Sequence, residues 1–305
     1  MADIKENRVH LLVQALNAPV VSVAKPLVIS DSLIPVEIWN LKSIERLISF
    51  DTPLSLGGHR MMLNNQGTYC VTAAHEESLL SCYGVSNGKL VWRRHDLRRI
   101  QRIMPAAKDD YFYCCFYDQP SLIVNIIDGQ TIDHMGKIAI ESIYESPFEQ
   151  LKVVVYDSRG RKIELIKDGK MVKQIARVTF GVLDVSFCPT GFCISESVGP
   201  VRFFDLSGNE LWRYQPPERK HVLNLEYSRK NQNFYGTELS LDRSKFTDTL
   251  LRFKSDFQEA EVIRKLDTAL GTFCSFGEFL VTASGDIINV DDGATVQHIP
   301  FFEQR

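Results

Sequence analysis

The chain has 305 residues, of which 44% are hydrophobic and 24% charged, a balance typical of a folded protein that buries a sizeable core. This composition excludes disordered and collagen-like chains. With 35 basic and 38 acidic side chains the formal net charge is −3, so the chain lacks the basic excess that nucleic-acid binding usually requires.

The N-terminal residues, MADIKENR, are charged on both sides of one isoleucine, and no apolar signal segment follows them. The longest apolar runs, such as APVVSVA, are too short to cross a membrane. The seven cysteines are an odd number and lie among apolar, strand-like residues rather than at spacings that frame loops. We therefore expect reduced, mostly buried thiols in a cytoplasmic protein that has no membrane partner.

Turn dipeptides recur along the chain at intervals of about 40 residues. They are Asn87-Gly88, Asp128-Gly129, Asp168-Gly169, Ser207-Gly208 and Asp292-Gly293. Such dipeptides between alternating apolar runs predict β-hairpins, because a type I′ turn needs positive φ at both central positions. Two more hairpins complete the series, one with its tip near Lys42-Ser43 and one that turns within residues 254–260. The chain therefore contains seven repeats.

In each repeat another hairpin precedes the one marked by the turn dipeptide. An example is MMLNNQGTYCVTAAH, which turns at residues 64–67. No stretch of about 12 or more residues has helical periodicity. Four short strands in each of seven repeats predict an all-β fold, a seven-bladed β-propeller with four-stranded antiparallel blades. We expect a single domain over residues 1–305, with blades at about 9–51, 58–95, 99–135, 138–176, 181–215, 221–267 and 269–301.

Residues 182–213, VLDVSFCPTGFCISESVGPVRFFDLSGNELWR, form the clearest repeat. Phe204-Asp205 stands where WD repeats have Trp-Asp, and Pro189-Thr190-Gly191 stands where they have a Pro-Asp-Gly-like turn. Trp39-Asn40 is a second partial match, and Gly58-His59 lies near the place of the family's Gly-His. By period and by these motifs the sequence resembles the WD40-type propellers, and the resemblance implies a scaffold that binds proteins.

Two ways of closing the propeller remain open. The last blade can take its fourth strand from the C-terminal end of the chain, in which case the N-terminal segments supply the first strands of the first blade. Alternatively, the N-terminal strand completes the last blade, as it does in many WD-repeat propellers.

The sequence carries no catalytic or metal-binding motif. The seven histidines are scattered, without an H-E-x-x-H or a C-x-x-C pair. GVSNG, residues 84–88, matches the G-x-S-x-G pattern of serine hydrolases, but it stands at a hairpin tip rather than a strand-to-helix turn, so we interpret Ser86 as a turn residue. We predict no enzyme activity, no metal and no cofactor. The alternative is a metal-dependent hydrolase or lactonase with its site in the central propeller channel.

Five arginines stand within WRRHDLRRIQR, residues 92–102. In the blade register this segment runs from the fourth strand of the second blade, through the loop between blades, into the first strand of the third. The loop opens on the face where WD-repeat proteins usually bind partners, and arginine both holds carboxylates and is enriched at interface hot spots. We therefore predict a protein partner with an acidic surface. The competing interpretation is that the arginines lie along solvated strand edges, where charge opposes aggregation.

The predicted partner-binding residues lie on this segment and on loops expected at the same face. They are Arg93, Arg94, Arg98, Arg99, Arg102, His75, Glu76, Glu77, Tyr117, Asp118, Asp157 and Arg159. An inhibitor or immunity protein that caps its partner is the specific form that we expect. A third alternative is single-stranded nucleic acid, held by the arginines together with Tyr111, Phe112 and Tyr113.

Overall fold

The structure is a computed structural model. It describes residues 10–14, 18–24, 33–53, 60–74, 78–136, 138–156, 162–175, 181–240, 248–254, 259–266, 271–274 and 277–301. The regular elements of these residues are β-strands, labelled β1 to β28. Within the same ranges the chain has no helix of the length and hydrophobicity needed to span a bilayer.

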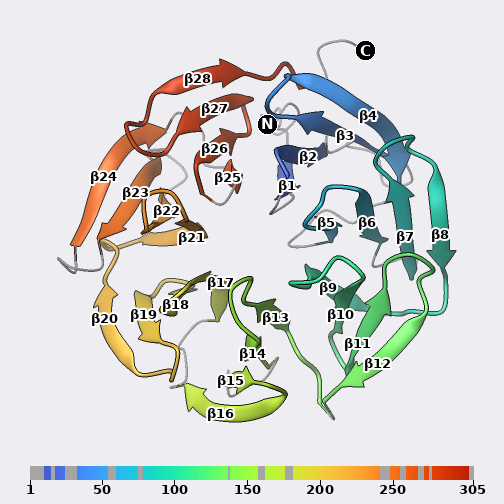
Figure 1. The fold of residues 1–305 in the computed structure, drawn as a ribbon, viewed down its shortest axis with the longest axis horizontal. Coiled ribbons are helices and arrows are strands. Elements are labelled where there is room, and N and C mark those ends of the chain that lie inside the picture. Colours follow the sequence, from blue (N-terminus) through green and yellow to red (C-terminus); the bar gives the residue numbers. More distant parts are fainter. Residues whose placement is uncertain are drawn as a thin grey trace, which may run out of the picture. The chain divides into compact units, whose positions relative to one another are not determined.

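Seven four-stranded antiparallel sheets follow one another along the chain (Figure 1). The first sheet comprises β1 (His10–Gln14), β2 (Val20–Ala24), β3 (Ile34–Asn40) and β4 (Glu45–Thr52). The second comprises β5 (Met61–Leu63), β6 (Tyr69–Ala74), β7 (Leu79–Gly84) and β8 (Leu90–Arg94). The third comprises β9 (Ile100–Pro105), β10 (Tyr111–Phe116), β11 (Ser121–Asn125) and β12 (Thr131–Met135).

The other four sheets repeat this order. The fourth comprises β13 (Ser142–Glu145), β14 (Leu151–Val155), β15 (Ile163–Lys167) and β16 (Lys170–Ile175). The fifth comprises β17 (Val182–Cys188), β18 (Gly191–Glu196), β19 (Val201–Asp205) and β20 (Glu210–Tyr214). The sixth comprises β21 (Lys220–Ser228), β22 (Asn233–Ser240), β23 (Asp248–Lys254) and β24 (Glu259–Leu266). The seventh comprises β25 (Gly271–Cys274), β26 (Phe279–Thr282), β27 (Asp286–Asn289) and β28 (Thr295–His298).

The fold class is therefore an all-β, seven-bladed β-propeller, as the spacing of the turn glycines predicts. Every sheet uses four strands that are consecutive in the chain. The last blade thus takes its fourth strand from the C-terminal end, and β1 belongs to the first blade, which confirms the first of the two closure alternatives. The hairpin tip expected near Lys42-Ser43 is the turn between β3 and β4, whereas residues 255–258 and Gly58-His59 lie outside the described residues.

By its internal contacts the chain divides into two compact units. The first contains residues 1–142, 283–286 and 298–305, and the second contains residues 143–282 and 287–297. The expectation of a single domain over residues 1–305 stays a prediction.

Within each unit, neighbouring blades share an apolar core. In the first unit one cluster joins Met62 and Leu80 of the second blade to Phe112 and Val124 of the third. In the second unit another joins Phe203 of the fifth blade to Phe253 of the sixth. Second and third strands such as β18 are buried on both faces because blades cover them on either side, whereas fourth strands such as β8 are sheet edges and largely exposed.

The turn before the fourth strand packs on the preceding blade. Gly129, with φ of +72°, lies directly against the indole of Trp92, and an added Cβ would stand 2.7 Å from two of its ring carbons. The same indole donates a hydrogen bond of 2.7 Å from Nε1 to the carbonyl oxygen of Ile126. Trp212 stacks on Phe203 of its own blade, with ring centroids 3.8 Å apart, and belongs to the core that the fifth and sixth blades share. Both tryptophans therefore have the structural role of holding a blade against its neighbour.

Candidate functional site

Two loops of the first unit meet at one end of the third blade. The 95–99 loop joins β8 to β9, and the 117–120 loop joins β10 to β11. Tyr117 N donates to Arg99 O at 3.3 Å, Gln119 Nε2 donates to Arg98 O at 3.4 Å, and the side chains of Arg99 and Asp118 form an ion pair. We call residues 95–99 and 117–120 the arginine surface.

Arg94 is committed to contacts within the molecule. Its Nε and Nη2 bind the two carboxylate oxygens of Asp96 at 3.0 and 2.6 Å, and its Nη1 donates to Gly129 O and Thr131 Oγ1, both at 3.0 Å. The hydrogen bond to Asp96 raises the pKa of Arg94, and the same bond lowers the pKa of Asp96. Arg94 therefore fastens the second blade to the third through its bonds to Gly129 and Thr131, and only 19% of its side chain is exposed.

Arg93 and Arg102 also have intramolecular partners. Arg93, on β8, donates a hydrogen bond of 3.2 Å from Nε to Oγ of Ser81 on the neighbouring strand β7. Arg102 is on β9 and forms a 3.2 Å ion pair with Glu141, and less than a quarter of either side chain is exposed. Arg94 and Arg102 are thus largely covered by the molecule rather than lying along solvated strand edges. Arg98 and Arg99 lie on the loop between β8 and β9, outside either strand.

Arg98 is the arginine that projects from this segment. Its side chain is exposed and makes no hydrogen bond or ion pair with the part of the chain that the structure describes. Beside it stand the Arg99–Asp118 pair, with side chains 60% and 49% exposed, and Tyr117, which is 38% exposed. The remaining predicted residues, His75, Glu76, Glu77, Asp157 and Arg159, lie outside the described residues.

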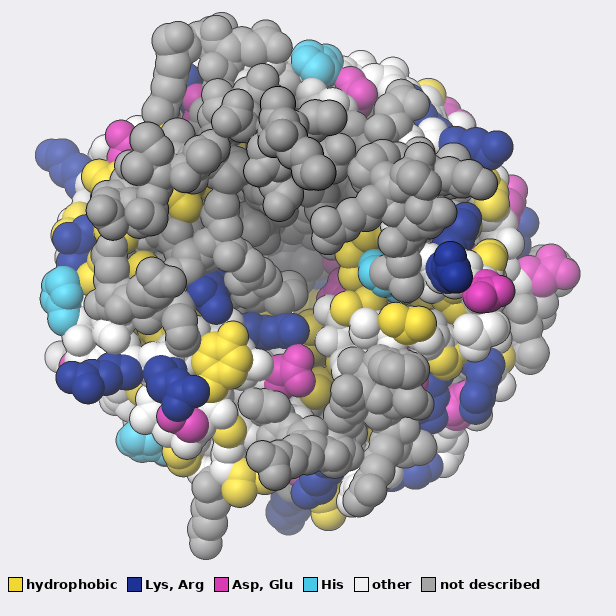
Figure 2. Space-filling view, turned by 180° about the vertical axis from the view of Figure 1, so that it is seen from behind, with side chains coloured by type: hydrophobic (Ala, Val, Ile, Leu, Met, Phe, Trp, Pro, Cys, Tyr) yellow, Lys and Arg dark blue, Asp and Glu magenta, His cyan; other side chains and the backbone are white. Residues whose placement is uncertain are grey.

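The arginine surface carries charges of both signs, because Asp96 and Asp118 lie on the same two loops as Arg98 and Arg99. Figure 2 shows basic and acidic side chains interspersed over the face that it draws, rather than a continuous basic patch. Phe112 and Tyr113 are fully buried in β10, so these two rings cannot stack on bases as the nucleic-acid alternative requires.

An acidic pair lies on two neighbouring first strands, β17 and β21, of the second unit. Both carboxylate oxygens of Asp184 accept backbone hydrogen bonds, from Val185 N at 2.9 Å and from Leu225 N at 2.8 Å. Burial, with the charge of Asp184 as a second cause, raises the pKa of Glu226 to about 8. The described residues contain no group of three or more His, Cys, Asp or Glu side chains that could hold a metal ion.

All seven cysteines are buried, which confirms the prediction of buried thiols, and none of them is paired in a disulfide. Burial raises the pKa of Cys82 and of Cys115 to about 12. These thiols therefore stay protonated at neutral pH and are poor nucleophiles.

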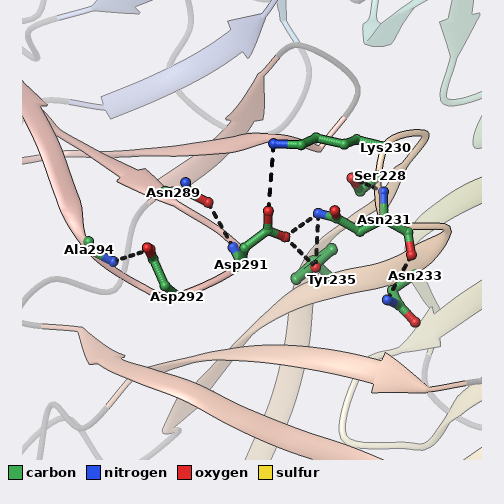
Figure 3. A network of polar contacts seen from close by, with 9 residues as sticks. All are labelled: Ser228, Lys230, Asn231, Asn233, Tyr235, Asn289, Asp291, Asp292 and Ala294. Carbon is green, nitrogen blue, oxygen red and sulfur yellow. Dashed lines mark hydrogen bonds and ion pairs between the residues drawn. The ribbon is translucent and has the colours of Figure 1, made fainter.

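A polar network in the second unit joins the β21–β22 turn to the β27–β28 turn (Figure 3). Asp291 accepts hydrogen bonds from Asn231 Nδ2 and from Tyr235 OH, the latter at 3.3 Å, and lies 3.8 Å from Lys230 Nζ. Its backbone N–H donates to Asn289 Oδ1 at 2.9 Å. With its carboxylate shared among three side chains, Asp291 links two blades and is not a free site.

The sequence predicted the two loops of the arginine surface. It did not predict which arginines bind groups within the molecule and which one projects from it. Arg94 and Arg102 are set apart by partners in the next blades, Gly129 and Glu141, which are 35 and 39 residues away along the chain. No local pattern in the arginine segment signals these contacts.

No family model and no curated protein matches the sequence. Among solved structures, the chain is similar to the β-propeller domain of Cps50 (Swd1) from Myceliophteria thermophila, with a TM-score of 0.65 and 8% identity over 96% of this chain and 98% of that one. It is also similar to the C-terminal WD40 domain of Sif2, with a TM-score of 0.59 and 10% identity over 91% of this chain and 94% of that one. Together with the seven four-stranded blades, these likenesses show that the chain has a WD40-like β-propeller fold.

Proposed function

We propose that this chain is a non-catalytic protein-binding module that docks its partner on the arginine surface. The observation that carries the proposal is the exposed side chain of Arg98, which has no described partner, on two loops joined by hydrogen bonds. A surface that is ordered before binding loses little conformational entropy when the partner docks. The family likeness supports the same role, since WD40 propellers are typically scaffolds.

The chemistry of Arg98 favours an acidic partner. A guanidinium without an internal counterion binds a carboxylate through two parallel hydrogen bonds, and Tyr117 beside it offers a flat ring of the kind enriched at interface hot spots. An inhibitor or immunity protein that caps the active surface of its partner is the specific form that we propose. We place it in the cytoplasm, and the buried, unpaired cysteines support a reducing compartment.

The test is affinity capture from native lysate with three versions of the chain. The wild type is compared with Arg98→Glu and with Lys42→Glu, a control that makes the same charge change at an exposed turn residue elsewhere in the first unit. We expect one stoichiometric protein with the wild type and the control, and its loss with Arg98→Glu. Equal capture by all three versions, or no stoichiometric protein at all, contradicts the proposal.

The inhibitor form is tested on the captured protein itself. We expect the activity of that protein to fall to near zero when the wild-type chain is added at a one-to-one ratio. The same amount of the Arg98→Glu variant should leave that activity unchanged. Metal analysis of the purified chain addresses the hydrolase alternative, because one bound metal ion per chain would support a metal-dependent site instead.

A further inference from the structure

The fourth strand of six blades contains a β-bulge at the same place. In each, one residue is passed over in the pairing with the third strand. The passed-over residues are Leu47, Val91, Ile132, Val172, Leu211 and Ile263. The first five are 42% to 61% exposed. A bulge in an edge strand opposes pairing with a strand of another chain, which accounts for the presence of the bulges. It does not account for the exposed aliphatic residues at these positions.

At one bulge these side chains line a groove. A cavity of about 560 Å³ lies between β4 and β8 in the first unit, with Leu47 on one side and Leu90 and Val91 on the other. Leu90 directly precedes the bulge, so two consecutive aliphatic side chains of β8 are exposed, each at 45%. The volume is within the range of pockets that enclose a ligand or several inserted side chains.

The walls of the groove are held in place by contact between the two blades. The side chain of Ile48, on β4, covers the backbone of Gly88. A Cβ atom added to Gly88 would stand 2.1 Å from Cδ1 of Ile48. Gly88 N donates to Gly84 O at 2.8 Å and thereby closes the turn that forms one end of the groove. The groove therefore exists before any partner arrives.

The rim of the groove carries one positive charge. Lys89 is the charged residue among the described lining residues, and its side chain makes no ion pair with any of the residues that are described. Its neighbours Ser86 and Asn87 are exposed and uncharged. A partner that fills this groove thus meets exposed aliphatic side chains, neutral polar groups and a single ammonium group that pairs with none of the described residues.

We propose that the groove between β4 and β8 binds a linear segment of a partner protein, with an apolar side chain inserted between Leu47 and Val91 and a carboxylate on Lys89. The bulge at Val91 disfavours addition of a partner strand to the edge of β8, so an inserted side chain is the contact that the groove accommodates. The groove adjoins Leu90 at the start of β8, whereas the arginine surface adjoins Arg94 at its end. This second surface is therefore independent of the proposed docking at Arg98.

Random peptides displayed on phage and selected on the immobilised wild-type chain provide the probe. We expect the enriched peptides to share an aromatic or aliphatic residue close to an Asp or Glu. Fluorescence anisotropy with labelled copies should show affinity lowered at least about tenfold by Val91→Lys and by Lys89→Glu. The matched control is Val172→Lys, which alters an equally exposed bulge residue of β16 and should leave the affinity unchanged.

Peptide binding that survives both Val91→Lys and Lys89→Glu, or a selection that enriches no peptide over the bare support, would overturn the proposal. Circular dichroism and thermal unfolding of each variant exclude loss of fold as the cause of lost binding. Arg98→Glu should bind the selected peptides as the wild type does, so failure of this proposal and failure of the proposed function are distinguishable.

Discussion

Arg94 reaches from the fourth strand of the second blade to the third blade, where its Nη1 lies 3.0 Å from the carbonyl oxygen of Gly129. Arg264 makes the same contact between the sixth and seventh blades, at 2.8 Å from Gly293 O. In both cases the same nitrogen also donates to a threonine two residues further on, Thr131 or Thr295. The repetition indicates that an arginine at this position is a device for fastening consecutive blades.

Replacement of Arg94 by Gln should lower the free energy of unfolding by about 2 kcal/mol, because a carbonyl oxygen and a carboxylate lose charged donors. Arg264→Gln should have a similar effect, and the two losses should add because the arginines share no partner. Urea denaturation measures both. The control is Arg98→Gln, which should change stability by less than about 0.5 kcal/mol, and a loss as large as that of Arg94→Gln would contradict this assignment.

A comparison of alanine substitutions at two glycines distinguishes the cost of backbone strain from the cost of a steric clash. Gly129 and Gly169 have almost the same φ, +72° and +74°, but an added Cβ meets the Trp92 ring at Gly129 and nothing within 4 Å at Gly169. We expect Gly169→Ala to cost about 1 kcal/mol for the left-handed conformation, and Gly129→Ala to cost about 2 kcal/mol more because Trp92 must move. Denaturation curves for the two variants test this, and equal losses would show that the contact with Trp92 is unimportant.

Stability should fall as the pH rises toward 8 because of Glu226. Its pKa is about 8 in the folded chain and close to the ordinary value of 4.5 when unfolded, so between these values the folded state binds more protons. The free energy of unfolding then decreases with rising pH, by at most about 1.4 kcal/mol per unit for one group. The loss is complete above the folded pKa.

The matched variant for this effect is Glu226→Gln, which has no proton to release. Urea denaturation between about pH 5 and about pH 9 should give a flatter pH dependence for the variant than for the wild type. Asp184 and Arg229 are the charged groups that act on Glu226, so their titration is common to both proteins. An unchanged slope in the variant would assign the pH dependence to other groups.

We predict that the chain unfolds as one domain although its contacts divide it into two units. The reason is that boundaries between the units fall inside β13, β27 and β28, so neither unit can unfold without disrupting a strand that continues into the other. Calorimetry should give one transition in which the van't Hoff and calorimetric enthalpies agree. The contrary result is two transitions, with the substitution Arg94→Gln shifting only the transition of the first unit. That result would show that the two units are separate domains.

The seven repeats and their strands were predictable because their signals are local. Each turn dipeptide marks its hairpin through a glycine with positive φ, and the alternation around it defines the adjacent strands. The expectation of type I′ turns is wrong for four of the five dipeptides, because only Asp168-Gly169 has positive φ at both residues. The motif in residues 182–213 likewise pointed to WD40-like blades before any three-dimensional information. Such signals need no knowledge of what lies across a blade.

The roles of single side chains needed the tertiary structure. Five arginines look equivalent within eleven residues of sequence, yet Arg94 is bound by Gly129 and Arg102 by Glu141, while Arg98 projects without a described partner. The apolar groove between Leu47 and Val91 was equally invisible, because its two sides belong to different blades. Turn geometry is decided within a few residues, whereas burial and charge pairing depend on contacts between blades, which only the folded chain brings together.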